Sequence, residues 1–153
     1  MIVSTKGRYA LRIMLDLSQH YGEGRVSVAE ISKRQSISRK YLESIISSLV
    51  KAGYVNGTRG KGGGYVLTRP PSEYRVSDII RLTEGSVAPV SCVDGSHLGC
   101  SMASECLTFP MWAGLDRVIE TYLGAITIQD LLDGKIIRPE MSDFTYQNNE
   151  KDS

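Results

Sequence analysis

Three cysteines are the residues of this 153-residue sequence whose type and spacing most suggest metal chemistry. Cys92, Cys100 and Cys106 lie in one segment without regular periodicity, so that three thiols can converge on one centre. No Cys-x2-Cys pair of the zinc-finger type is present, but thiolates also suit iron–sulfur clusters. Asp94 and Glu105 make the segment polar, which disfavours inert cysteines in a core. The pattern favours a metal or cluster site and leaves redox-active thiols as an alternative.

A cluster held by three cysteines needs a fourth ligand, and the sequence leaves its identity open. His97 lies within the cysteine segment, as do Asp94 and Glu105, although His97 also suits a solvated loop. His20, the other histidine, falls in a segment with helical spacing and is expected at the surface. The predicted metal ligands are therefore Cys92, Cys100 and Cys106, with the fourth ligand unknown.

A second chemistry-bearing segment, residues 56–64, combines two cations with five glycines. Glycine lets such a backbone approach a phosphate chain or enter a minor groove, where arginine is a recurrent contact. No Gly-Lys-Ser/Thr ends the segment and no strand-loop-helix unit follows, which argues against a nucleotide-binding loop. An exposed loop without a ligand is the other interpretation. We expect DNA contacts from Arg59, Gly60 and Lys61.

Charge and composition restrict the class of protein. Residues 1–85 hold 14 Lys and Arg against 7 Asp and Glu, and residues 86–153 hold 4 against 10, giving the net charge of +1. A basic half favours a polyanion such as nucleic acid, although solvated surface charge can also be split unevenly. The composition is typical of a globular chain, and no apolar run approaches the roughly 20 residues of a membrane helix.

Two further properties bear on location and chemistry. The first residues turn polar after Val3, unlike a signal peptide, and the cysteines are too few for a secreted disulfide scaffold. We therefore expect a cytoplasmic protein without a membrane partner. No constellation of His, Asp and Ser and no paired carboxylates in a plausible pocket are recognisable, so we do not expect an enzyme.

Helical periodicity in the first half predicts the elements that position the cations. Apolar residues spaced by three and four predict helices over about 5–21, 28–35 and 39–52. Ser38 is a suitable cap for the third helix. Only residues 36–38 connect the second helix to the third, as a helix-turn-helix requires.

A β-hairpin is predicted to follow these helices, because short apolar stretches at 54–55 and 65–67 flank the glycine-rich segment. With a short helix at about 76–83, this makes a winged helix-turn-helix DNA-binding domain over 1–85, whose third helix would lie in the major groove. Arginine can pair with guanine and a carboxylate can accept from cytosine, although Glu43 also suits a solvent-exposed position. The candidate DNA-binding residues of this helix are Ser38, Arg39, Lys40, Tyr41 and Glu43.

The second half predicts a loop followed by a broadly apolar helix. Residues 86–110 show no sustained period and form the cysteine loop. After Pro110, a helix at about 111–124 has more apolar surface than one neighbouring face can cover. A short helix at about 128–132 follows, and residues 136–153 are expected to form a flexible tail. The predicted fold class is mainly α with a small β-hairpin.

Four motifs in this sequence resemble the Rrf2 family of bacterial transcription regulators, and most closely its iron–sulfur cluster regulators. The resemblance covers about residues 1–135. The motifs are Ser4-Thr5-Lys6-Gly7-Arg8-Tyr9-Ala10, Tyr41-Leu42-Glu43, Arg59-Gly60-Lys61-Gly62-Gly63-Gly64-Tyr65 and Ile126-Thr127-Ile128-Gln129-Asp130-Leu131.

The resemblance implies a homodimer, joined by dimerisation helices over 111–135, that binds a palindromic operator in double-stranded DNA. The cysteine loop would hold an iron–sulfur cluster, [2Fe–2S] favoured over [4Fe–4S], whose occupancy alters which promoters are bound. Glu43 would tune site choice with cluster state. The implied function is regulation, mostly repression, of genes for cluster biogenesis or for iron, redox or nitric oxide responses.

Two departures from the family pattern keep the fourth ligand open. Phe109 stands where cluster-binding relatives place a histidine, and Arg8 stands where nitric-oxide-sensing relatives recruit an acidic residue. The run 83–90 also resembles relatives that lack the cysteines and act by binding a cysteine-synthesis enzyme. The alternative function is therefore a cluster-free repressor of cysteine or sulfur metabolism that responds to a thiol signal or a partner enzyme.

Overall fold

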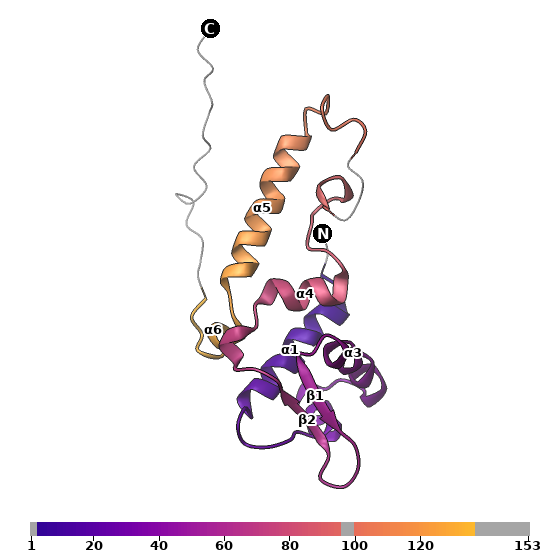
Figure 1. Cartoon of the computed structure of the whole chain (residues 1–153), viewed down its shortest axis with the longest axis vertical. Helices are drawn as coiled ribbons and strands as arrows, with labels where there is room; N and C mark the ends of the chain where they lie inside the picture. Colours follow the sequence, from indigo (N-terminus) through magenta and orange to yellow (C-terminus); the bar gives the residue numbers. More distant parts are fainter. Residues whose placement is uncertain (1–2, 96–99, 137–153) are drawn as a thin grey trace.

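The computed structural model describes residues 3–95 and 100–136, so that His97 and residues 137–153 of the predicted tail lie outside the described residues. Figure 1 shows short helices around a hairpin and a longer helix that extends away from them. The predicted class, mainly α with a small β-hairpin, is confirmed. The elements are α1 (Thr5–Gln19), α2 (Val28–Gln35), α3 (Arg39–Lys51), β1 (Val55–Thr58), β2 (Gly64–Leu67), η1 (Pro71–Glu73), α4 (Val76–Glu84), η2 (Ser91–Val93), α5 (Phe109–Ala125) and α6 (Ile128–Leu132).

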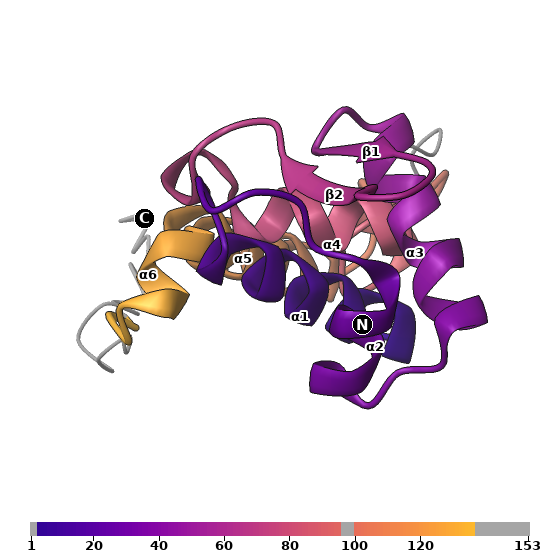
Figure 2. The same cartoon turned by 90° about the horizontal axis from the view of Figure 1, so that it is seen from below.

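Helix α1 is central to the head, which we define as α1–α4 with the hairpin. It contacts α2, α3, α4, α6 and β2, and α6 and α3 lie on opposite sides of it (Figure 2). Apolar residues repeat at helical spacing in α1 and α3, so each helix buries one face. The shared core contains Ala10, Ile13, Met14 and Leu17 of α1, Ile31 of α2, Leu42, Ile45, Ile46 and Leu49 of α3, and Ile128 of α6.

The hairpin is longer than the two short apolar stretches predicted. Antiparallel pairing of β1 with β2 continues to Thr58↔Gly64, because the glycine-rich segment carries the ladder further toward the tip. The N–H of Tyr65 donates to the Val26 carbonyl (2.8 Å) and the N–H of Val26 to the Tyr65 carbonyl (3.0 Å). A Cβ at Gly64 would lie 2.6 Å from the Val26 oxygen, so only glycine permits this approach.

Helix α5 packs on the head through one side only. It contacts α4 and η2, and none of its residues is buried. The exposed fractions of its apolar side chains are 57% for Met111, 41% for Leu115 and 37% for Val118. The head of one chain therefore leaves an apolar stripe of α5 uncovered. Within the described ranges, no helix combines the length and apolarity that crossing a bilayer requires.

Two predicted helix boundaries are wrong by two residues. The first helix ends at Gln19, because the chain turns through Gly22, whose φ of 82° is not helical. Helix α5 begins at Phe109, inside the predicted loop 86–110, with Pro110 in its first turn. Proline fits anywhere in that turn because its missing N–H has no intrahelical partner there.

Candidate nucleic-acid interface and cysteine loop

The turn between α2 and α3 is fixed by one left-handed residue and one buried residue. Ser36 adopts a φ of 54°, which reverses the chain directly after α2. Ile37 is 3% exposed, and its carbonyl accepts a hydrogen bond from Ser32 Oγ (2.6 Å). Ser38 then caps α3, since its Oγ accepts from the Tyr41 N–H at 3.4 Å. The turn therefore sets the direction of α3 relative to α2.

Helix α3 divides cleanly into a buried face and an exposed face. The apolar side chains of its buried face belong to the core of the head. The predicted base-reading and phosphate-contacting side chains all lie on the exposed surface. They are Arg39, Lys40, Tyr41 and Glu43.

Tyr41 is held at the start of α3 by an aromatic contact with α1. The ring centroids of Tyr41 and Tyr9 are 5.8 Å apart at an interplanar angle of 67°, an edge-to-face arrangement. The guanidinium of Arg12 lies 5.2 Å from the centroid of Tyr9. Arg12 also donates to Gln35 at the end of α2, from Nε to Oε1 (3.1 Å) and from Nη2 to the carbonyl. This contact chain fixes the start of α3 against both preceding helices.

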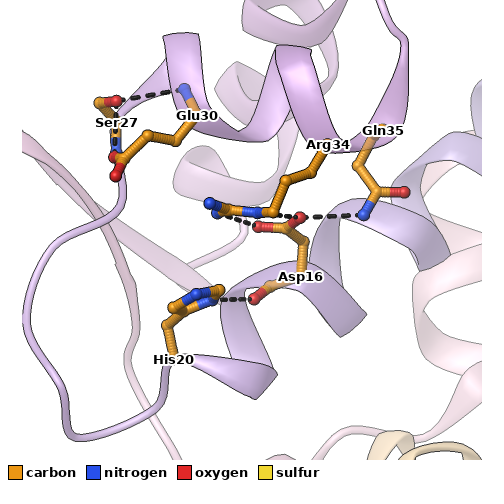
Figure 3. A network of polar contacts seen from close by, with 6 residues as sticks. All are labelled: Asp16, His20, Ser27, Glu30, Arg34 and Gln35. Atoms are coloured by element: carbon orange, nitrogen blue, oxygen red, sulfur yellow. Dashed lines mark hydrogen bonds and ion pairs between the residues drawn. The ribbon is translucent and has the colours of Figure 1, made fainter.

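A buried carboxylate of α1 organises the last turn of α2 (Figure 3). The side chain of Asp16 is 0% exposed. It accepts from Arg34 Nη2 (2.8 Å), Arg34 Nε (3.0 Å) and Gln35 Nε2 (2.9 Å). Burial raises the pKa of Asp16, but hydrogen bonds from Arg34 and Gln35 and the Arg34 charge outweigh it, leaving that pKa below its ordinary value. Asp16 is therefore ionised and holds α2 on α1.

The hairpin presents its cations at an exposed tip. Arg59, Gly60 and Lys61 are all exposed, and the tip is closed by a hydrogen bond from the Gly63 N–H to the Gly60 carbonyl (2.9 Å). Gly60 has a φ of 94°, which a residue with a side chain rarely adopts. Strand β1 packs against α3. The two groups of predicted DNA-binding residues thus come from neighbouring elements of the head.

The loop between α4 and α5 carries three unpaired thiols. Cys92 in η2 and Cys106 are half-buried, and Cys100 is exposed. Thr108 Oγ1 lies 3.3 Å from Cys106 Sγ. Hydrogen bonding by the Thr108 side chain and backbone, with a further contribution from the Phe109 backbone, lowers the pKa of Cys106. A lowered pKa favours the thiolate, which is the form that binds metals and attacks disulfides.

The chemistry of this donor set fits an iron–sulfur cluster, but its arrangement does not yet form a site. Three reduced, accessible thiols are the ligands that such a cluster takes. Among the described residues, however, no three Cys, His, Asp or Glu side chains are grouped as a metal site. Glu105, one of the candidates for the fourth ligand, is exposed. Cluster binding therefore requires the cysteine loop to draw its thiols together.

An ion pair joins the cysteine-loop side of α5 to the head. Arg81 Nη2 of α4 lies 2.6 Å from both carboxylate oxygens of Glu120 on α5, and Arg81 Nη1 lies 3.4 Å from Asp78. A pocket of about 280 Å³ beside this pair is also lined by Asp94 and Asp116. Burial raises the pKa of Asp116, and the charges of Glu120 and Asp94 raise it further. Negative charge is thus concentrated where the loop meets α5.

Sequence reasoning missed the residues that orient the head. Asp16 lies between Ile13 and Leu17 on the apolar face of α1, and an acidic residue at such a position signals a buried charge with a partner. Tyr74 is 1% exposed and forms several hydrogen bonds through its hydroxyl. No local pattern identified it, because its partners lie in other elements.

The three-helix core, the short turn before α3 and the hairpin define the chain as a winged helix-turn-helix transcription regulator. Residues 3–134 match the Rrf2 family, described as an iron-dependent transcriptional regulator. The HTH-type transcriptional regulator IscR of Aliivibrio salmonicida is 42% identical over 132 residues, which cover 86% of this chain and 77% of that protein. The chain belongs to the Rrf2 family, and the predicted resemblance is confirmed.

Solved structures of two regulators are similar to the whole described fold. The T. potens IscR matches with a TM-score of 0.69 and 38% identity, covering 93% of this chain and 96% of that one. CymR, the global cysteine regulator of B. subtilis, matches with a TM-score of 0.67 and 34% identity, covering 88% and 98%. These relatives are transcription regulators, which confirms the prediction that this chain is a DNA-binding regulator and not an enzyme.

Proposed function

We propose that the chain reads a palindromic operator through the start of α3 and the tip of the hairpin. The β1–β2 hairpin is the wing of this fold. The candidate contacts are Ser38, Arg39, Lys40, Tyr41 and Glu43 at the start of α3 and Arg59, Gly60 and Lys61 at the tip of the wing. The observation that carries this proposal is that the side chains on both elements are exposed while the helices beneath them are locked by buried contacts. A rigid frame with exposed cations suits a duplex, because phosphate contacts fix the register in which bases are read.

The regulator acts as a homodimer in this proposal, joined through α5. The uncovered apolar stripe of Met111, Leu115 and Val118 supports this assembly, because a second copy would remove it from water. Two heads related by a two-fold axis would then meet two half-sites of the operator. Such DNA lies in the bacterial cytoplasm.

DNA binding is further proposed to depend on an iron–sulfur cluster held by Cys92, Cys100 and Cys106, with [2Fe–2S] favoured and the fourth ligand open. The three free thiols, the lowered pKa of Cys106 and the IscR-named relatives support this proposal. A bound cluster supplies redox chemistry and sensitivity to iron supply. The loop ends at α5, so a cluster bound by the loop would act on the helix that is proposed to join the two copies.

One specific similarity favours a second function. The fold is also similar to a regulator named for cysteine control, CymR of B. subtilis. A cluster-free repressor of cysteine or sulfur metabolism would use the same head and would need no metal. Its signal would be a thiol or a partner enzyme.

Oxygen-free purification followed by iron and sulfide analysis distinguishes the two functions. Under the cluster proposal the protein is coloured and contains both elements, and the triple Cys→Ala variant contains neither. That variant still binds some duplexes, since the head does not include the cysteines. A colourless, iron-free wild-type preparation that binds DNA normally would exclude the cluster and favour the cysteine regulator.

A further inference from the structure

The hydroxyl of Tyr74 is hydrogen-bonded to both roots of the wing, by which we mean the residues just before β1 and just after β2. It donates to the carbonyl of Tyr54, the residue before β1 (2.8 Å). It accepts from the N–H of Thr68 (3.1 Å) and the N–H of Arg69 (2.9 Å), which follow β2. One buried oxygen therefore closes the hairpin at the end opposite to its tip.

The backbone of Tyr74 is bonded to the junction between α5 and α6. The N–H of Ile128 donates to the Tyr74 carbonyl and the N–H of Val76 to the Ile126 carbonyl, both at 2.9 Å. Arg75 and Thr127 form an isolated antiparallel bridge between these pairs. The segment that carries Tyr74 thus pairs like a short strand with the chain that follows α5.

Aromatic and cationic contacts stiffen the same point. The rings of Tyr54 and Tyr74 are 5.5 Å apart at 64°, and the guanidinium of Arg69 lies 5.4 Å and 4.8 Å from their centroids. Because Tyr74 is 1% exposed, water does not replace these bonds while the head is folded. The roots of the wing can therefore move only if the Tyr74 segment moves with them.

We propose that Tyr74 is the positioning residue that fixes the wing to the α5–α6 junction, and so determines where Arg59 and Lys61 meet DNA. The inference rests on the proposed function, because it assumes that the wing contacts the duplex. It adds that a change in the orientation of α5 is transmitted to the wing through the hydrogen bonds of Tyr74. Tyr74 itself need not touch DNA.

The test is a double-mutant cycle between Tyr74→Phe and Arg59→Ala. Affinity is measured by fluorescence anisotropy at fixed salt, on a duplex selected from a randomised library by the wild-type protein. Tyr74→Phe weakens binding about tenfold in the wild-type background and by less than about twofold when Arg59 is already alanine. Tyr54→Phe is the matched control, because Tyr54 contributes its carbonyl rather than its hydroxyl, and it stays within about twofold of the wild type.

Hydrogen exchange supplies a readout that does not depend on DNA. The amide of Arg69 exchanges faster in Tyr74→Phe than in Tyr54→Phe, because its acceptor has been removed. Equal losses from Tyr74→Phe in both backgrounds, or an unchanged Arg69 amide, would overturn the proposal. An Arg59→Ala protein that binds like the wild type would instead contradict the wing contacts of the proposed function. If Tyr74→Phe does not fold, Thr68→Val is the second variant, because Thr68 Oγ1 lies 3.1 Å from the Tyr74 hydroxyl. Thr68→Val must then show the same dependence on Arg59.

Discussion

Asp16 on α1 and Arg34 on α2 form a two-point ion pair in which the carboxylate is fully buried and the guanidinium remains partly exposed. This asymmetry decides which partner the fold needs more. Removing Arg34 leaves a charge buried without its main partner, whereas removing the charge of Asp16 leaves a guanidinium that water can reach. The pair therefore orients α2 and, through the turn that follows α2, also α3. The penalty for burying a charge is borne by the carboxylate of Asp16, because Arg34 remains partly exposed.

Arg34→Met is consequently predicted to destabilise the head more than Asp16→Asn. We expect a loss of about 3–5 kcal/mol in the free energy of unfolding for Arg34→Met and about 1–3 kcal/mol for Asp16→Asn. Urea denaturation at neutral pH measures both. Arg117→Met, an exposed arginine of α5 outside the network, is the matched control and should change the stability little. The reverse order of the two losses would contradict the proposed asymmetry.

At low pH, the wild type is predicted to lose its greater free energy of unfolding relative to Asp16→Asn. The pKa of Asp16 is lowered in the folded state, so the folded protein binds fewer protons there than the unfolded chain. The contribution of the ionised Asp16 to stability is therefore complete above the pKa of about 3.9 in the unfolded chain. It is lost as the pH falls through the lower pKa in the folded state. Urea denaturation at successive pH values below neutrality should show the two stabilities converging in that window. A difference that stayed constant to the lowest pH would show that Asp16 is not charged in the fold.

The positions of the surface cations could be predicted from sequence because they depend on local patterns. The apolar spacing of Leu42, Ile45 and Leu49 determines which face of α3 is buried, and the remaining positions must face outward. Asp16 and Arg34 lie in different helices, so their pairing depends on how α1 and α2 pack, and spacing does not reveal it. The cysteine loop lacks any period, so the arrangement of its thiols could not be derived from the sequence.

Arg59→Ala is predicted to weaken operator binding by about 1–3 kcal/mol without altering the fold. The residue is exposed at the wing tip, so its removal should leave the urea midpoint unchanged. The logarithm of the binding constant should also fall less steeply with the logarithm of the salt concentration for Lys61→Ala. The slope should change by about one unit, because one phosphate contact is lost. Arg117→Ala removes the same kind of charge from α5 and should leave affinity unchanged. Equal effects of Arg59→Ala and Arg117→Ala would indicate general charge attraction in place of a wing contact.

Leu115→Glu and Val118→Glu are predicted to prevent formation of the proposed dimer and to leave a monomer. Both side chains belong to the stripe of α5 that the head leaves uncovered, and a buried carboxylate in a dimer interface would lack a partner. Light scattering coupled to size-exclusion chromatography gives the mass of each species. Gln19→Glu adds the same charge to an exposed site on α1 and should leave the mass unchanged. A wild-type protein that is monomeric at all concentrations would remove the role assigned to this stripe.

The thiol of Cys106 is predicted to react faster than that of Cys92 in the metal-free protein. The hydrogen bonds of Thr108 lower its pKa, which raises the thiolate fraction near neutral pH. Iodoacetamide labelling followed by peptide mass spectrometry should therefore modify Cys106 before Cys92, which is similarly half-buried. Thr108→Val removes the hydroxyl and should slow labelling at Cys106 alone. If a cluster occupies the loop, anaerobic protein should resist labelling at all three positions until the metal is removed, whereas a cluster-free regulator should label at the same rate before and after chelation.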